Sequence, residues 1–174
     1  RAVQQGVLSR YWFEQAKVGD LLRLYGPLGT FFMRPAADRD VIFLATGTGI
    51  APVKAMLEAL ILVEGVPRQA RSVSVYWGGR TPSDLYWPGL SDYNGIRYVP
   101  VLSRADASWP GARGHVQDCA LQDFVRFDQA VVYACGSEAM IRSAHSALSQ
   151  AGLPAERFYA DAFVCSASTE KENA

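Results

Sequence analysis

Short apolar runs alternate with segments of helical pattern between residues 41 and 163, and this alternation constrains the fold more than any other feature of the sequence. Unbroken apolar strands separated by helices are typical of a parallel sheet that is covered on both faces. The sequence therefore predicts an α/β domain with a parallel, Rossmann-like sheet of about five strands and helices on both faces. The expected strands cover residues 41–45, 72–77, 96–102, 130–135 and 157–163, and the expected helices cover residues 52–64, 116–124 and 138–151, with a short helical piece at 83–87.

The pattern changes near residue 35, where RPAADRD places proline and charges between two differently organised regions. Upstream, LSRYWFEQ is interpreted as a short helix or turn, and DLLRLYG and GTFFM as the last strands of an antiparallel unit. We predict three parts: this antiparallel remnant at residues 1–34, the α/β domain at 35–165 and a disordered polar tail at 166–174. Because the chain begins with Arg1 rather than Met, we expect a fragment of a longer protein.

Composition excludes several classes of function. Seventeen basic residues balance seventeen acidic ones, so the basic excess that nucleic-acid binding needs is missing. The longest apolar stretch, residues 55–63, contains Glu58 and is far shorter than the roughly 20 residues of a membrane span. Cys119, Cys135 and Cys165 show no C-x-x-C spacing, which argues against a disulfide framework and against a metal site. We therefore expect a cytoplasmic protein without a membrane span, a nucleic-acid partner or a bound metal.

The turn after the first expected strand is TGTGIAP, residues 46–52. Gly47 and Gly49 let the backbone approach a ligand closely, and Pro52 suits the first helical position because its missing N–H would be unpaired there anyway. A helix start also offers free N–H groups and a partial positive charge, so the turn favours a pyrophosphate. The glycines would equally serve a tight strand-to-helix connection, because Pro52 stands where a full G-x-G-x-x-G fingerprint has its third glycine.

Two further strand ends carry glycines. Gly78, Gly79 and Arg80 follow the second expected strand, and Cys135-Gly136 follows the fourth. Ligands of open parallel sheets bind outside the carboxyl ends of the strands, so the three turns are predicted to share one site. Taken singly, each turn also has a structural interpretation, as a tight connection, a surface charge or a small buried residue.

These motifs resemble, in the same order, those of the C-terminal nicotinamide-binding part of the ferredoxin–NADP reductase-like flavoprotein family. The similar stretches are GTGIAP at 47–52, YWGGRTPSDLYW at 76–87 and YACGSEAM at 133–140. GDLLRLYGPLGTFF at 19–32 is similar to the end of the family's flavin-binding barrel, which implies that residues 1–34 are the end of an FAD-binding barrel. The closing GLPAERFYADAF is similar to reductases of CDP-6-deoxyhexose synthesis, and GGR is similar to NADH-dependent oxygenase reductases.

The resemblance implies that a nicotinamide dinucleotide lies along the three turns. The residues after the first strand would lie under the pyrophosphate and the nicotinamide ribose, and those after the second would face the adenosine end. Cys135 would have a positioning role beside the nicotinamide ring, leaving space for the ring to reach flavin N5, because the redox chemistry belongs to the cofactors. The implied dinucleotide-binding residues are Gly47, Thr48, Gly49, Pro52, Gly79, Arg80, Asp84, Cys135, Gly136, Ser137 and Met140.

Contacts with FAD are implied near both ends of the chain. Gly6, Val7, Leu8 and Ser9 are similar to the family's G-x-x-S segment, which receives the flavin pyrophosphate, and Phe163 is similar to the aromatic residue near the isoalloxazine. Ser9 also fits an ordinary helix N-cap, and Phe163 also fits a core position. The family's R-x-Y-S flavin segment would lie upstream of Gly6, so FAD is expected in the complete protein.

The adenosine end bears on the choice between NADH and NADPH. NADPH-dependent members of the family resemble one another in having Ser-Arg and further basic or tyrosine contacts for the 2′-phosphate, to which Arg offers a bidentate fork. Gly-Gly-Arg with Asp84 close behind is more similar to the NADH-dependent members. NADH is therefore predicted over NADPH, with Arg80 leaving NADPH as the alternative. His115 and His145 have no evident catalytic partners in the sequence and are given structural roles.

The resulting prediction is a fragment of an NADH-dependent flavoprotein reductase. Its complete form would pass hydride to FAD and single electrons to an iron–sulfur domain or another acceptor. The alternative is a non-catalytic nucleotide-binding or electron-transfer module that works with a separate flavin-bearing chain. A third interpretation is a protein-interaction domain in which the glycine turns are purely structural.

Overall fold

A computed structural model describes residues 6–26, 28–62, 70–87, 89 and 93–163 of the chain. Residue contacts divide the chain into two units, Arg1–Thr30 and Phe31–Ala174. Each unit is described by itself.

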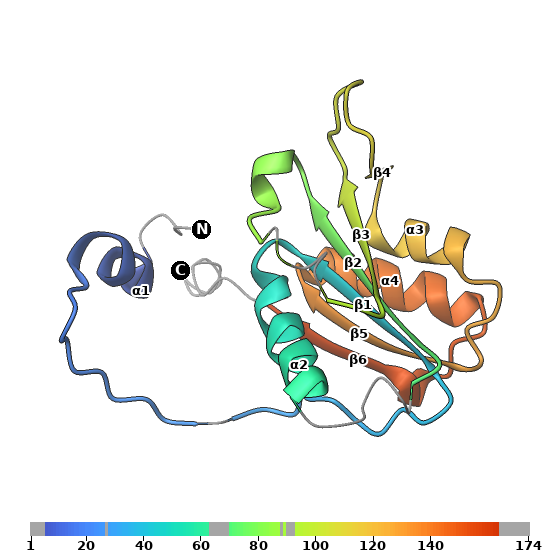
Figure 1. Ribbon diagram of the computed structural model, residues 1–174, viewed down its shortest axis with the longest axis horizontal. Helices are drawn as coiled ribbons and strands as arrows, with labels where there is room; N and C mark the ends of the chain where they lie inside the picture. The colour runs from blue at the N-terminus through green and yellow to red at the C-terminus, as the bar shows by residue number, and fades with distance from the viewer. Residues whose placement is uncertain (1–5, 27, 63–69, 88, 90–92, 164–174) are drawn as a thin grey trace, which may run out of the picture. The chain divides into compact units, whose positions relative to one another are not determined.

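The larger unit is built on one parallel sheet of six strands (Figure 1). Across the sheet the strands are ordered β4-β3-β2-β1-β5-β6. The chain adds three strands on one side of β1 and then two on the other, so the direction of winding reverses between β1 and β5. This is the topological switch point at which open α/β sheets bind ligands. The strands are β1 (Asp40–Thr46), β2 (Ser72–Gly79), β3 (Ile96–Leu102), β4 (Ala112–Arg113), β5 (Ala130–Gly136) and β6 (Phe158–Ala162).

Helices cover both faces of this sheet, with α2 on one side and α3 and α4 on the other (Figure 1). Successive side chains of a strand point to opposite faces. On β1, Val41 and Phe43 pack in the cluster that contains the α2 side chains, whereas Ile42 and Leu44 pack in the cluster that contains those of α3 and α4. Burial on both faces explains why the central strands are apolar without alternation. The helices are α2 (Ile50–Leu62), α3 (Val116–Asp123) and α4 (Glu138–Gln150).

The predicted α/β fold is confirmed, with two local differences in the sheet and its connections. The sheet has six strands instead of about five, because β4 is only two residues long and has no apolar run of its own. Residues 83–87 were predicted as helical, but the helical structure there is limited to the 3₁₀ turn Pro82–Asp84, which overlaps only residues 83 and 84. Thr81 and Asp84 form a capping box that closes this turn on itself, and the backbone leaves the helical region at Leu85.

The start of α2 also differs from the prediction. Pro52 is the third residue of the helix and not the first, because the 3₁₀ turn Gly47–Gly49 leads directly into Ile50. Proline is still tolerated there, since the N–H groups of the first helical turn have no acceptor within the helix. The predicted end of this helix at residue 64 lies outside the described residues.

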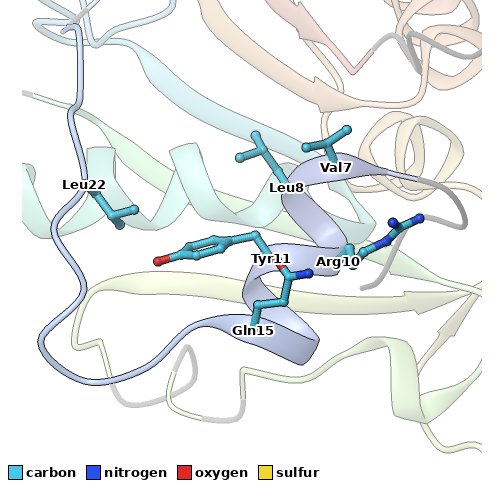
Figure 2. Close-up of a pocket in the computed structure, with 6 residues that line it drawn as sticks. All are labelled: Val7, Leu8, Arg10, Tyr11, Gln15 and Leu22. Carbon is cyan, nitrogen blue, oxygen red and sulfur yellow. The ribbon is translucent and has the colours of Figure 1, made fainter.

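The smaller unit contains a short helix. The helix α1 (Val7–Arg10) continues into the π-helical turn Tyr11–Gln15, which agrees with the predicted helix or turn. The Tyr11 hydroxyl donates to Asp20 Oδ2 at 2.8 Å, and the Lys17 N–H donates to the same oxygen at 2.9 Å. The hydrogen bonds from Lys17 and Tyr11 lower the pKa of Asp20. This unit has a hollow of about 540 Å³. Figure 2 shows the residues that line it, which are Val7, Leu8, Arg10, Tyr11, Gln15 and Leu22.

The antiparallel strands predicted upstream of residue 35 are not formed in residues 16–26 and 28–34. A strand requires a neighbour for its N–H and C=O groups, and the described part of this chain pairs no strand with these residues. The side chains of Leu21, Leu24 and Tyr25 are almost fully exposed. The domain boundary at residues 34 and 35 stays a prediction, and the tail at 166–174 and Cys165 lie outside the described residues.

Neither a membrane span nor a metal cluster is found in the described ranges. No helix there combines the length and the apolar character that crossing a bilayer requires. The His, Cys, Asp and Glu side chains of the same residues do not gather in groups of three or more suited to a metal ion.

Candidate dinucleotide-binding site

Three glycine-containing turns leave the carboxyl edge of the sheet from the neighbouring strands β2, β1 and β5. In the register of the sheet, Thr46 at the end of β1 lies opposite Gly78 of β2, and Ala45 lies opposite Cys135 of β5. The structure thus brings together the three turns that the sequence analysis expected to share one site. The switch point lies where the ends of the paired strands β1 and β5 meet this edge.

The turn after β1 needs both of its glycines, for different reasons. Gly47 has a φ of +54°, in the left-handed region, and a Cβ added there would meet nothing within 4 Å. Gly49 is buried, and a Cβ added there would collide with the backbone carbonyl of Cys135. Gly47 therefore leaves open space above the turn, and Gly49 allows the backbone of the 3₁₀ turn before α2 to touch the backbone of β5.

The turn after β5 is fitted to β1 in the same way. Gly136 has a φ of +146°, and a Cβ added there would collide with the side chain of Thr46. The backbone N–H of Ser137 donates to Thr46 Oγ1 at 3.3 Å. The Thr46 hydroxyl thus joins the two turns across the switch point. The sequence analysis assigned Thr46 no role, because its contact with Ser137 depends on the pairing of strands that are far apart in the chain.

Some of the predicted site residues at the end of β5 are exposed, and others are buried. Ser137 is exposed and caps α4, its Oγ accepting the N–H of Met140 at 3.3 Å. The side chain of Met140 packs in the hydrophobic core with that of Leu148 and does not line the edge of the sheet. Cys135 is fully buried, and desolvation raises the pKa of its thiol to about 12. A neutral thiol of small volume fits a packing role and not acid–base catalysis.

Cys135 is therefore expected to resist alkylation in the folded chain. At pH 8 its thiol is protonated and buried, whereas in the unfolded chain it has an ordinary pKa and full access to reagent. Modification by iodoacetamide, followed by peptide mass spectrometry, should be at least about 100-fold slower in buffer than in denaturant. Rapid modification of Cys135 in the folded chain would contradict its burial.

The turn after β2 is closed by Asp84. Its Oδ2 accepts the backbone N–H groups of Arg80 at 2.9 Å and Thr81 at 3.2 Å. A Cβ added at Gly79 would lie 2.9 Å from the Cβ of Asp84, so only glycine fits this closure without displacement. Asp84 and Gly79 thus have a structural role in shaping the turn, and the side chain of Arg80 is exposed beside them.

A second arginine lies next to Arg80. The backbone N–H of Arg104 donates to the carbonyl of Arg80 at 3.1 Å, and that of Ser103 donates to the carbonyl of Gly79 at 3.0 Å. The pairing of β2 with β3 therefore continues past the strand ends and places two exposed basic residues together. The sequence analysis missed Ser103 and Arg104. The signal that it lacked was the register that sets Gly79 opposite Leu102.

The residues implied in FAD binding lie in both units. Gly6 is the N-cap of α1, Val7 and Leu8 are exposed, and Ser9 lies inside the helix, so the interpretation of Ser9 as an N-cap is wrong. The Phe163 N–H donates to the carbonyl of Gly136 at 2.9 Å, and its side chain is 46% exposed, which is not a core position.

The two histidines are exposed. His115 is the N-cap residue of α3 and makes no side-chain capping hydrogen bond. The His145 ring packs edge-on against Phe158, with a centroid distance of 5.0 Å. This contact agrees with the structural role given to His145.

Fold and site together define an α/β dinucleotide-binding domain, with glycine turns converging at a topological switch point. Residues 43–146 match the family model described as the oxidoreductase NAD-binding domain, and the chain belongs to this family. The resemblance to ferredoxin–NADP reductase-like proteins is likewise confirmed by individual relatives.

Two curated relatives and one solved structure illustrate the similarity. The CDP-6-deoxy-L-threo-D-glycero-4-hexulose-3-dehydrase reductase of Yersinia pestis is 41% identical over 94% of this chain and 50% of the relative. Reductase component 2 of terephthalate 1,2-dioxygenase from a Comamonas species is 33% identical over 86% of this chain and 45% of the relative. The structure of the ferredoxin reductase in carbazole 1,9a-dioxygenase superposes with a TM-score of 0.81 at 26% identity, covering 94% of this chain and 50% of that one. The chain thus spans about half the length of these relatives.

Proposed function

We propose that this chain is the NADH-binding part of a flavoprotein reductase, in which hydride passes from NADH to FAD. The observation that carries the proposal is the contact of the β1 and β5 turns at the switch point, with Gly49 against the Cys135 carbonyl and Gly136 against Thr46. This contact brings the start of α2, a favourable place for a pyrophosphate, next to a turn whose small residues leave room for a flat ring.

The residues present fit a nicotinamide dinucleotide. The open space at Gly47 and the exposed Thr48 suit a pyrophosphate at the start of α2. Cys135, Gly136 and Ser137 would hold the nicotinamide end, and Gly79 and Arg80 the adenosine end. When bound, the nicotinamide and the flavin supply the hydride chemistry, and the protein positions them. Met140 and Pro52 would contribute through the shape of their helices.

NADH is proposed as the preferred dinucleotide. Asp84 places a carboxylate at the adenosine end, where negative charge disfavours a 2′-phosphate. Arg80 and Arg104 offer two cations at the same place and would allow NADPH to bind as the weaker ligand.

In the complete protein, electrons would leave the flavin singly for an iron–sulfur domain or another acceptor. Two relatives support this proposal, one named as a hexulose dehydrase reductase and one as a reductase component of a dioxygenase. FAD would contact Gly6, Val7, Leu8, Ser9 and Phe163, and the protein would be cytoplasmic. A non-catalytic module that serves a separate flavin-bearing chain remains the second candidate, because the chain spans about half the length of its relatives.

Calorimetric titration of this chain with NADH and NADPH in parallel tests the proposal. We expect saturable binding of both, with NADH tighter, and the visible absorbance of the same sample reports bound flavin. NADH binding without flavin, together with diaphorase activity only after a flavin domain is joined, would support the role of a nicotinamide domain. If neither dinucleotide binds, residues 47–52 are only a structural turn and the proposal fails.

A further inference from the structure

Trp77, which the site described above does not include, contacts the turn after β1. Its indole lies on β2 and is fully buried, and its Nε1–H donates to the carbonyl oxygen of Gly47 at 3.1 Å. The same oxygen accepts the backbone N–H of Ile50 at the start of α2. Two donors from different elements therefore fix the direction of this carbonyl group.

The direction of the Gly47 carbonyl sets the direction of the next amide. In a trans peptide the C=O and the following N–H point to opposite sides. The N–H of Thr48 therefore points away from the indole and out of the 3₁₀ turn that leads into α2, where Thr48 is exposed. An unsupported glycine peptide at a φ of +54° has more conformations than one held in this way, so the hydrogen bond selects one of them.

Tyr86 covers the indole from the side of the β2–β3 connection. The two rings meet edge to face, with centroids 5.1 Å apart and planes at 90°. Tyr86 is itself 57% exposed, whereas Trp77 beneath it has no exposed surface. By excluding water from the indole, the Tyr86 ring strengthens the hydrogen bond to Gly47.

We propose that Trp77 is a positioning residue for the dinucleotide: through the Gly47 carbonyl it aims the Thr48 amide at the pyrophosphate, and Tyr86 keeps the indole in place. This inference rests on the proposed function, because it requires NADH to bind at the turn after β1. It adds that the affinity of this turn depends on an indole N–H supplied by the neighbouring strand.

Trp77→Phe, which keeps an aromatic ring but removes the donor, tests the inference in the full chain. We expect its Kd for NADH to rise about fivefold, as the loss of one hydrogen bond implies. Trp87→Phe is the matched control, since this tryptophan lies in the β2–β3 connection and its ring packs on Tyr93. The control should bind NADH within about twofold of the wild type.

Fluorine NMR of the chain labelled with fluorotryptophan provides a second measurement. A purely structural role of Trp77 would leave its resonance unchanged when NADH binds. Trp12→Phe, Trp87→Phe and Trp109→Phe each remove one resonance, so the resonance present in all three spectra belongs to Trp77, and we expect saturating NADH to shift it. Tyr86→Ala, a change at an exposed position, should raise the Kd in the same direction and reduce the shift. These two measurements decide the question even where Trp77→Phe does not fold.

The outcomes separate the two proposals. If wild type binds NADH while Trp77→Phe and Tyr86→Ala bind equally well, the positioning role is overturned and the proposed function stands. An unshifted Trp77 resonance in the NADH-saturated protein would also overturn it. If wild type binds no dinucleotide, the proposed function itself fails.

Discussion

Gly49→Ala is expected to abolish measurable NADH binding and to lower the free energy of unfolding by about 3 kcal/mol. The added methyl group would collide with the backbone carbonyl of Cys135, which belongs to the fully buried strand β5 and has no rotamer with which to move aside. Either α2 shifts away from the sheet or β5 is displaced, and both changes separate the turns of the proposed site.

Chemical denaturation measures the stability change, and calorimetry with NADH measures the binding change. Gly152→Ala is the control: unlike Gly49, Gly152 has a left-handed φ, +95°, but a Cβ there meets nothing within 4 Å. Through conformational strain alone, Gly152→Ala should lower the free energy of unfolding by about 1–2 kcal/mol, and it should leave NADH binding unchanged. A Gly49→Ala protein as stable as the control and still able to bind NADH would show that the β1–β5 contact is not required.

Removing both arginines of the adenosine end is expected to weaken NADPH binding about tenfold and to leave NADH binding within about twofold. Arg80 and Arg104 are exposed and adjacent through the hydrogen bond between their backbones. Their guanidinium groups would pair with the 2′-phosphate, which NADH lacks. The double variant Arg80→Ala/Arg104→Ala should therefore increase the preference for NADH.

Parallel titrations of the double variant and the wild type at one ionic strength give the ratio of the two affinities. Arg126→Ala, which removes an exposed cation paired with Asp128, controls for the loss of overall charge. If NADH and NADPH lose affinity equally, the arginines act on a part that both cofactors share. If neither loses affinity, the adenosine lies elsewhere.

Much of the fold could be predicted because the central strands are buried on both faces. The run of residues 96–102 coincides with β3, and the start of α4 at Glu138 agrees with the predicted start of that helix. β4 escaped prediction because two residues have no periodicity. The strands expected at residues 20–26 and 29–33 are not formed for another reason: a strand forms only with a partner, and the sequence pattern does not supply one.

The candidate site, like the fold, could be predicted only where the signal is local in the sequence. Each glycine turn could be found locally, from glycines that follow an apolar run. The contacts between turns could not, because the approach of Gly49 to Cys135 and of Arg104 to Arg80 depends on which strands become neighbours. The indole of Trp77 is a further case, since a buried tryptophan on a strand is indistinguishable in sequence from an ordinary core residue until its N–H is seen to reach Gly47.

The crowding between the ends of β1 and β5 has a consequence for how such a protein can diversify. Backbone packs against backbone at Gly49, and Gly136 packs against Thr46, whose hydroxyl accepts the Ser137 N–H, so this joint leaves little room to enlarge or trim a side chain. The neighbouring ends of β2 and β3 carry exposed side chains that substitution can change freely. Under the proposed function, cofactor preference could thus drift at one end of this edge while the geometry of the nicotinamide end stays constant.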